Sequence, residues 1–289
     1  MTVSHVAYYA TPKHLGQLQA VLSGRDLAIM HTLASYRLAR GDQLRRWHFT
    51  GHASLEAQAR AARRNLRRLA DLGLISHLER RIGGIHAGSS GLVWHLTRLG
   101  RLLLARVNNH PPTGRIDQTE PSPRTLDHTL AITETAVRLQ ETTMANQCEL
   151  IQLDPEPASW RTYLNPYGGT TTLKPDLFAI TAALSGIFQD EPEYEDVWFI
   201  EIDRATESRA TIIRKAEQYE TYRHTGREQA AQDVFPRVAW IVPNETRADM
   251  IRETLAQNIR IEAGLHIAVT TDQFIRIVCG NPENSEPPP

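Results

Sequence analysis

Residues 54–73, SLEAQARAARRNLRRLADLG, decide the fold of the first part of this chain. Ser54 is a favourable N-cap and Gly73 a favourable C-terminal stop, so the segment predicts one helix that runs to Asp71. Its arginines occupy the positions outside the apolar face, which predicts a helix with one basic side. Apolar residues at helical spacing predict the buried face, namely Leu55, Ala59, Ala62, Leu66 and Leu69.

The neighbouring sequence predicts the elements around this helix. Two helices precede it, one capped by Ser23 or Asp26 and a short one at 41–49. The elements expected after it are a strand at 74–82, a glycine-rich turn at 83–91, a strand at 92–96 and a helix at 98–107. Three helices followed by a β-hairpin is the order of a winged helix-turn-helix.

The basic helix and the hairpin together predict a surface for double-stranded DNA. The helix would be about 25 Å long, which is enough to lie in the major groove. Arginine grips phosphate or guanine through two hydrogen bonds. The expected contacts are Arg60, Arg63, Arg64, Arg67 and Arg68 on the helix and Arg80 and Arg81 in the hairpin. The alternative is a solvated basic face on a protein-interaction domain.

The net charge of −1 hides a division between the two halves of the chain. Residues 1–110 carry 16 Lys and Arg against 5 Asp and Glu, which gives +11. Residues 111–289 carry 16 against 28, which gives −12. A basic half suits the phosphate backbone, whereas DNA would repel an acidic half unless its carboxylates surround a metal ion or lie on a remote face.

Length and composition predict two domains. A chain of 289 residues is about twice the usual domain length. Four prolines within residues 108–123 predict a linker between a domain at 1–107 and a second at 124–280, and the proline-rich residues 281–289 predict a flexible tail. No apolar run is long enough to span a membrane, so no membrane partner is expected.

The two cysteines, Cys148 and Cys279, are far apart and not in a CxxC pair. Their spacing argues against structural zinc or a disulfide framework and favours a reducing compartment. The N-terminus has no basic start followed by an unbroken apolar stretch, so no secretory signal is readable. We therefore expect a cytoplasmic protein.

The second half predicts the element order α-β-β-β-α-β, in an α/β domain. A buried strand at 197–203 is its clearest element, because it is apolar until it ends in acids. The other expected elements are a helix at 124–143, a hairpin with arms at 163–164 and 171–180, a helix at 208–222, a strand at 238–242, a helix at 247–259 and a last strand at 274–278. The whole chain is thus expected to be α+β.

The carboxylates of this half resemble those of the PD-(D/E)xK nuclease-like fold. In that fold, carboxylates on adjacent strands hold a divalent metal that activates water for phosphodiester cleavage. The resemblance implies that Asp176, after Pro175, is the first acid, that Glu201 is the second, and that Glu134 is the acid of the first helix. Glu201 and Asp203 stand at i and i+2, which puts both on one face of the strand.

The lysine of that pattern is displaced. Asp203 stands where the lysine is expected, and the resemblance implies Lys215 on the next helix as its substitute. Gln218 and Tyr222 are similar to a helix motif of RecB-type nucleases. Because the lysine is not at its usual position, the sequence does not decide whether the second domain is catalytic. A domain that keeps the nuclease-like fold but has lost catalysis is one alternative.

The expected cofactor is Mg²⁺ or Mn²⁺, because both prefer hard oxygen ligands such as Asp176 and Glu201. Asp203 and Glu134 are secondary ligand candidates, and Lys215 would stabilise the attacking hydroxide and the charge on phosphate. The alternative is structural: Asp176 caps a turn, and the two acids of the strand form ion pairs at its end.

Nearly the whole chain resembles the replication-relaxation family of plasmids and integrative elements. The segments that carry the resemblance are GRDLAIMHTLASYRLARGDQLRRWHF at 24–49, ARRNLRRLADLGLI at 62–75, WHLTRLGRLLL at 94–104, LDHTLAITE at 126–134, LKPDLF at 173–178 and FIEIDRATES at 199–208, followed by Lys215 and Tyr219. The family implies a role in plasmid replication, DNA relaxation or transfer, with replication or transfer proteins as partners. A homodimer is a further expectation, because winged helices often pair on palindromic sites.

These observations lead to two functional hypotheses. The first is a DNA-binding protein of a mobile genetic element whose second domain nicks or cleaves DNA with a metal ion. The second is a non-enzymatic regulator or replication-initiation factor with an inactive nuclease-like domain. A tyrosine-based relaxase would need a His-hydrophobic-His motif, which the chain lacks, so Tyr219 and Tyr222 are expected to pack or to contact substrate.

Overall fold

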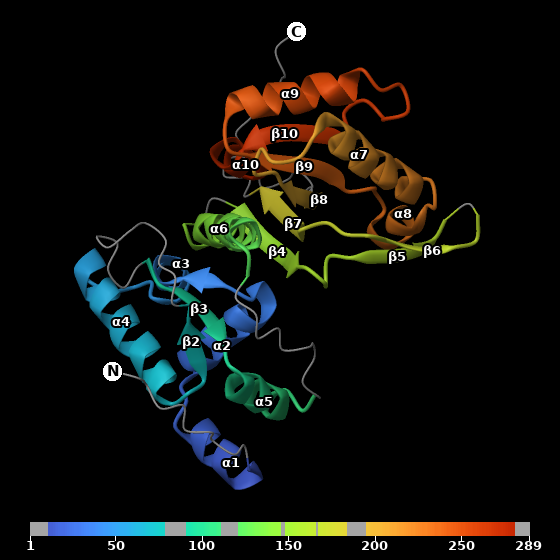
Figure 1. Ribbon diagram of the computed structural model, residues 1–289. Coiled ribbons are helices and arrows are strands. Elements are labelled where there is room, and N and C mark those ends of the chain that lie inside the picture. The colour runs from blue at the N-terminus through green and yellow to red at the C-terminus, as the bar shows by residue number, and fades with distance from the viewer. Residues whose placement is uncertain are drawn as a thin grey trace, which may run out of the picture. The chain divides into compact units, whose positions relative to one another are not determined.

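The computed structural model describes residues 11–78, 91–110, 121–145, 148–165, 167–183 and 195–280. The chain divides into two compact units, Met1–Thr133 and Glu134–Pro289, whose elements are labelled in Figure 1. The mixture of helices and sheets in these units confirms the α+β class expected from the sequence.

Helices make up most of the first unit. Ser54 caps α4 as predicted, and Ser23 and Asp26 form a capping box at the start of α2. Leu55 is 76% exposed, because it is the first helical residue and lies ahead of the buried positions of α4. The helices are α1 (Pro12–Ala20), α2 (Gly24–Tyr36), α3 (Gly41–His48), α4 (Leu55–Asp71) and α5 (Arg98–Val107).

A small antiparallel sheet completes this unit. Its strands are β1 (Ala39–Arg40), β2 (Ile75–His77) and β3 (Val93–Leu96), in the order β1-β3-β2. The pairing of β2 with β3 confirms the expected hairpin arms, whereas the two-residue β1 is too short to be recognised from alternation. The turn expected at 83–91 lies outside the described residues.

Helix α6 (Pro123–Met144) contains the boundary between the two units. Its first half belongs to the first unit, where Leu126 and Leu130 pack with Leu38 and Val93. The hydroxyl of Thr133 donates to the carbonyl oxygen of Leu38 at 2.8 Å. The linker expected at 108–123 ends at the first residue of this helix, and its residues 111–120 are outside the described part of the chain.

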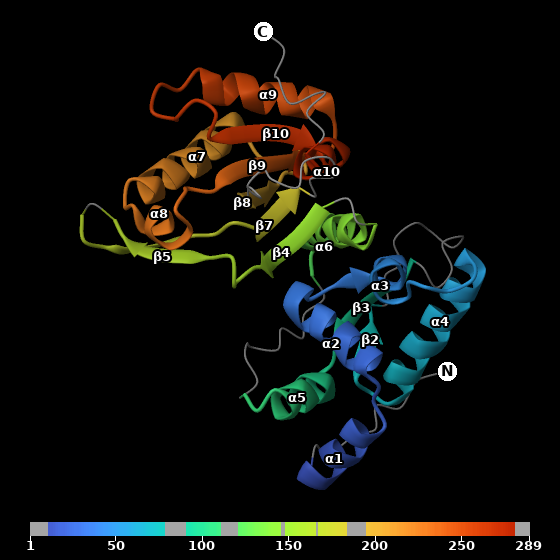
Figure 2. The same ribbon diagram turned by 180° about the vertical axis from the view of Figure 1, so that it is seen from behind.

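The second unit is built on a five-stranded sheet in the order β10-β9-β8-β7-β4. Neighbouring strands β4, β7 and β8 run antiparallel, whereas β8, β9 and β10 run parallel. The strands are β4 (Cys148–Pro155), β7 (Leu177–Ala183), β8 (Glu195–Ile202), β9 (Arg237–Val242) and β10 (His266–Thr270). A separate hairpin of β5 (Arg161–Leu164) and β6 (Thr170–Leu173) is labelled in Figure 1 and seen from behind in Figure 2.

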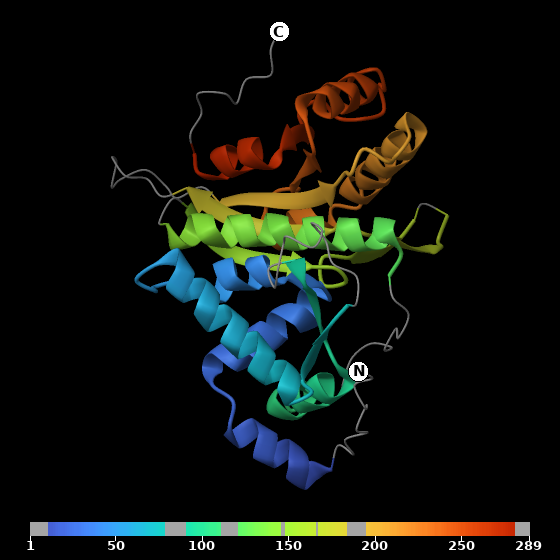
Figure 3. The same cartoon turned by 60° about the vertical axis from the view of Figure 1, so that its left-hand side comes forward.

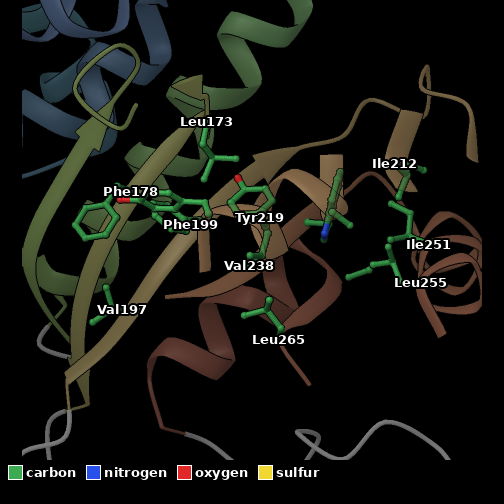
Figure 4. Packing of buried hydrophobic residues seen from close by; sticks show 14 of the residues in the cluster. Leu173, Phe178, Val197, Phe199, Ile212, Tyr219, Val238, Ile251, Leu255 and Leu265 are labelled. Carbon is green, nitrogen blue, oxygen red and sulfur yellow. The ribbon is translucent and has the colours of Figure 1, made fainter. Parts of the chain in front are cut away.

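Helices cover both faces of this sheet. On one face α7 (Arg209–Arg223) and α9 (Glu245–Ala256) lie side by side (Figure 3) and bury a core that includes Tyr219 and Phe199 (Figure 4). Trp198 points to the opposite face, where its ring meets Phe274 of α10 (Thr271–Val278) at 5.3 Å. A short helix, α8 (Arg227–Gln232), follows α7.

Two expected strands were wrong. The strand expected at 171–180 is interrupted at Lys174–Asp176, because Pro175 cannot donate a ladder hydrogen bond, and its two parts belong to different sheets. The strand expected at 274–278 is helix α10, in which a capping box between Thr270 and Gln273 starts the helix. Phe274 and Val278, at i and i+4, are its buried residues.

None of the helices in the described ranges has the length and apolar character needed to cross a lipid bilayer.

Candidate functional site

The exposed arginines of α4 form a stripe along the helix. Arg60, Arg63, Arg64 and Arg67 are all exposed, and Arg60 and Arg67 each lie three or four residues from both Arg63 and Arg64. The buried residues Ala62, Leu66 and Leu69 occupy the opposite side of the helix. One of the four, Arg60, pairs with Glu56 at 2.8 Å on the surface. We call these four residues the arginine stripe.

Arg68, which was expected to contact DNA, has a different environment. Its guanidinium forms an ion pair with Asp26, whose side chain is fully buried. Asn65 donates to the same carboxylate at 2.8 Å, and the backbone N–H of Ser23 donates at 2.7 Å. Burial would raise the pKa of Asp26, but these hydrogen bonds outweigh it and lower the pKa. Arg68 therefore fastens α4 to the start of α2.

Arg80 and Arg81, the expected contacts in the hairpin, lie outside the described residues.

The second group of candidate residues meets where β7 begins beside the end of β8. The N–H of Asp176 donates to the carbonyl oxygen of Ile200 at 3.1 Å. The N–H of Ile202 donates to Oδ2 of Asp176 at 2.7 Å. Asp176 is thus held beside residues 200–202, whose middle residue is Glu201. Both carboxylates are buried.

Glu201 is held from α7. Lys215 donates from Nζ to Oε2 at 3.0 Å, and Tyr219 donates from its hydroxyl to Oε1 at 2.6 Å. The pKa of Glu201 is raised to about 7, because burial and the charge of Asp176 raise it by more than Lys215 and Tyr219 lower it. A carboxylate that titrates near neutral pH and has a cation partner is a common feature of functional sites.

Lys215 is shared between two carboxylates. Its Nζ lies 3.0 Å from Glu201 and 3.0 Å from Oε1 of Glu207, in the loop between β8 and α7. These two acids raise the pKa of Lys215 despite its burial, so its ammonium stays charged. The other oxygen of Glu207, Oε2, is buried without a hydrogen-bond partner. We call Asp176, Glu201, Glu207, Lys215 and Tyr219 the acidic cluster.

Asp203 takes a separate partner. Arg247, on α9, donates to both of its carboxylate oxygens at 2.9 and 2.7 Å. The same guanidinium donates to the backbone oxygen of Glu207 at 2.8 Å, so this ion pair also holds the loop that carries Glu207. Glu201 and Asp203 are two residues apart but contact different helices.

Gln218, Glu134 and Tyr222 are the remaining candidates. Gln218 is exposed on α7, and Tyr219, the next residue, has the contact with Glu201 instead. Glu134 is half-buried on α6 and is not among the groups that shift the pKa of Glu201. Tyr222 donates to Glu228 at 2.8 Å and packs on Phe199, so it has a structural role.

The sequence did not reveal Glu207 or Arg247. Glu207 sits in a loop, one residue before the N-cap Ser208, and nothing in its local pattern distinguishes it from a solvated acid. Arg247 lies 44 residues from Asp203 in the chain, so their pairing depends on the packing of α9 against the sheet. Tyr219 was expected to pack or to contact substrate, and its ring packs on Phe199 at 5.6 Å.

The acidic cluster offers two carboxylates to a hard divalent cation, Asp176 and Glu201. The described residues contain no group of three or more His, Cys, Asp or Glu side chains placed to hold a metal ion. Mg²⁺, however, is often bound through one or two carboxylates, with water and phosphate oxygens as its other ligands. Asp176 and Glu201 supply two such groups on neighbouring segments.

Comparison with known proteins gives one match. The model of a family described as "Replication-relaxation" matches residues 30–238, which include α4, strands β4, β7 and β8 of the sheet and the acidic cluster. No curated protein and no solved structure matches the chain.

Proposed function

Because the chain belongs to the replication-relaxation family, we propose that it binds double-stranded DNA of a mobile genetic element through its first unit. We propose further that its second unit nicks or cleaves that DNA with Mg²⁺ or Mn²⁺. Family membership suggests a role in replication or relaxation, and replication or transfer proteins are the partners that this role implies.

The first unit supports DNA binding through its charge and its element order. The arginine stripe presents four guanidinium groups along one side of α4, and residues 1–110 carry a net charge of +11. Helices α2, α3 and α4 followed by the paired strands β2 and β3 have the order of a winged helix-turn-helix. In that fold the third helix enters the major groove. A homodimer on a palindromic site belongs to the same proposal.

The second unit supports a PD-(D/E)xK-type nuclease. The main sheet and its helices follow the order α-β-β-β-α-β. These elements are helix α6, the antiparallel strands β4, β7 and β8, helix α7 and the parallel strand β9. The observation that carries the proposal is the contact of Lys215 with Glu201, beside Asp176. It brings a lysine from the next helix to the second acid of the motif.

The roles of the residues follow from their contacts. Asp176 and Glu201 would hold the cation, which lowers the pKa of a bound water and polarises phosphate oxygens. Tyr219 fixes the orientation of Glu201 through its hydroxyl. Lys215 stays charged near neutral pH, so it can hydrogen-bond to the attacking water and stabilise the charge that develops on the phosphate.

The test is nicking of supercoiled plasmid in the presence of Mg²⁺ or Mn²⁺. We expect open-circle product with the wild-type protein, and none with Asp176→Asn, Glu201→Gln or added EDTA. Gln257→Ala, a change at an exposed glutamine that follows α9 and belongs to no candidate site, is the matched control and should leave nicking unchanged. If no form of DNA is cut under any of these conditions while binding is intact, the enzymatic part of the proposal is wrong.

A non-enzymatic regulator or replication-initiation factor is the second candidate. The observation in its favour is that Glu201 and Asp203 already have full ion-pair partners, Lys215 and Arg247, as in a purely structural network. This candidate predicts site-specific DNA binding without cleavage. It also predicts that Glu201→Gln changes the free energy of unfolding and leaves DNA binding unchanged.

A further inference from the structure

The hairpin of β5 and β6 presents two apolar side chains to solvent at its tip. Leu164, the last residue of β5, is 66% exposed, and Tyr167, in the turn, is 96% exposed. Tyr163 and Leu173, on the same two strands, belong instead to the buried core of the second unit. The hairpin therefore has one side that packs on its own unit and a tip whose aromatic ring is available to a partner.

The turn holds Tyr167 in place without using its side chain. Oδ1 of Asn165 accepts hydrogen bonds from the N–H groups of Tyr167 and Gly169, both at 3.0 Å. Its Nδ2 donates to the hydroxyl of Thr171 at 3.2 Å. Gly168 has a φ of +78°, which glycine adopts without strain. A change of the Tyr167 side chain should thus leave the turn intact.

Helix α8 holds the base of the hairpin. Arg161 of β5 forms an ion pair with the buried carboxylate of Glu228, and its guanidinium lies 4.5 Å from the ring centroid of Phe178. Arg227 donates from Nη1 to the carbonyl oxygen of Thr162 at 3.0 Å. The hairpin extends past α8, away from the five-stranded sheet (Figures 1 and 2). It is an arm with a fixed base and a projecting tip.

The charge of the arm differs from that of the unit that carries it. Residues 157–175 contain no Asp or Glu, although residues 111–289 contain 28. Lys174, directly after β6, and Arg227, at the base of the arm, are both exposed, and the exposed residue Thr162 adds a hydroxyl group. Lysine, arginine and threonine side chains are common donors to phosphate oxygens. The arm therefore suits a polyanion, which the rest of an acidic unit would repel.

The arm leads directly into the acidic cluster. Strand β6 ends at Leu173, and Asp176 follows three residues later. Tyr167 and Asp176 are nine positions apart, so the chain limits the distance between their Cα atoms to about 30 Å. A DNA strand advances about 3.4 Å per nucleotide, so this limit corresponds to about nine nucleotides. DNA with a phosphate at the acidic cluster is thus within reach of the tip.

We propose that the arm of β5 and β6 binds DNA beside the proposed cleavage site, with Tyr167 stacked on an unpaired base. This inference rests on the proposed function, because it adds a contact to the same DNA. Every base has an aromatic face, so stacking on tyrosine requires no particular sequence. Lys174 and Arg227 contact phosphates of the same strand. The arm thus favours DNA that is opened near the site.

The test is ultraviolet cross-linking of the full chain to a short duplex with a central gap of unpaired 5-iodouracil nucleotides. EDTA is present, so the result does not depend on cleavage. We expect an adduct on Tyr167, located by mass spectrometry of the digested protein. Fluorescence anisotropy of the same DNA measures affinity, and Tyr167→Ala should lose the adduct and raise the Kd for the gapped duplex by about tenfold.

Two further variants separate stacking from a general loss of exposed apolar surface. Tyr167→Phe keeps the ring and should bind the gapped duplex as the wild-type protein does. Ile259→Ala, at a fully exposed apolar residue outside the arm, is the matched control and should change neither adduct nor affinity. All of these positions are exposed, so the variants should fold.

The inference is overturned if bound DNA gives no adduct within residues 157–175, or if Tyr167→Ala binds the gapped duplex as tightly as Ile259→Ala. A tip that contacts a partner protein instead of DNA would give this result. An adduct on Tyr167 without any nicking in Mg²⁺ supports the arm and removes only the nuclease. Nicking without an adduct removes the arm alone.

Discussion

Nζ of Lys215 lies 3.0 Å from Oε2 of Glu201, although the two residues belong to a helix and a strand. The contact joins the second acid of the proposed motif to the lysine that the motif lacks at its usual position. Glu207 shares the same ammonium. Lys215 therefore keeps one carboxylate partner if a cation takes the oxygen of Glu201.

Replacement of Lys215 by methionine tests its proposed role in the chemistry. Methionine keeps much of the apolar stem but removes the charge, so the rate of plasmid nicking should fall by about 100-fold or more. DNA affinity should stay unchanged, because Lys215 lies outside the arginine stripe. The measurement is the initial nicking rate at saturating Mg²⁺, with Gln257→Ala as the reference. A variant with full nicking activity would remove Lys215 from the mechanism.

Replacement of Tyr219 by phenylalanine tests the electrostatics of Glu201. The tyrosine hydroxyl stabilises the ionised form of Glu201, so its loss should raise a pKa that is already about 7. Glu201 must be ionised to hold a cation, so activity should be lost at a higher pH in the variant. We expect the acidic limb of the pH–rate profile to move upward by roughly one pH unit. An unmoved limb would mean that Glu201 does not control the reaction.

Charge reversal in the arginine stripe tests DNA binding. Arg63→Glu with Arg67→Glu should weaken binding to duplex DNA and lower the slope of log K against log salt by about 2, because each phosphate contact contributes about 0.9. The matched control is Arg260→Glu with Arg276→Glu, two exposed arginines of the second unit. Titrations over a range of salt concentrations provide the measurement. Equal losses in both double variants would indicate a general charge effect and no specific role for the stripe.

Arg68 should act on stability and leave DNA contacts unchanged. Arg68→Met leaves the buried carboxylate of Asp26 without its cation, which should cost about 1 to 2 kcal/mol in the free energy of unfolding, because solvent partly screens the half-exposed guanidinium and Asn65 and Ser23 still donate to the carboxylate. Because the folded pKa of Asp26 is lowered, its contribution is present above its ordinary pKa of 3.8 and is lost as pH falls through the folded value. Urea unfolding at about pH 7 and about pH 3 measures both effects. The cost should shrink at the lower pH, and a cost that does not depend on pH would contradict this role.

The sequence predicts elements well where local signals agree. Helix α4 begins after Ser54 and ends at Asp71 as expected, because cap, apolar spacing and stop all indicate the same bounds. The buried strand β8 is also recognisable from its continuous apolar run. In contrast, β4 was missed because a register shift between Leu150 and Gln152 breaks the alternation of its side chains.

The candidate site could be predicted only in part. Asp176, Glu201 and Lys215 were expected together from the resemblance to the PD-(D/E)xK fold, and the structure brings them together. The partner of Asp203 was not predictable from the sequence. Arg247 lies on α9, after strand β9, and its distance from Asp203 depends on how α9 packs against the sheet. For the same reason Arg68 was grouped with the DNA contacts, although its ion pair lies with Asp26, 42 residues earlier. Sequence patterns reveal the chemistry of a residue, whereas its partner depends on packing.

The hydrogen bond from the N–H of Ile202 to Asp176 has a consequence for how this family can be compared. The carboxylate closes the end of a strand pair as well as serving the proposed chemistry, so its loss would cost stability whether or not the protein cuts DNA. An aspartate at this position is therefore poor evidence that a given member is active. Lys215 has a structural duty as well, because it neutralises Glu201 and Glu207, so neither residue alone marks a member as active.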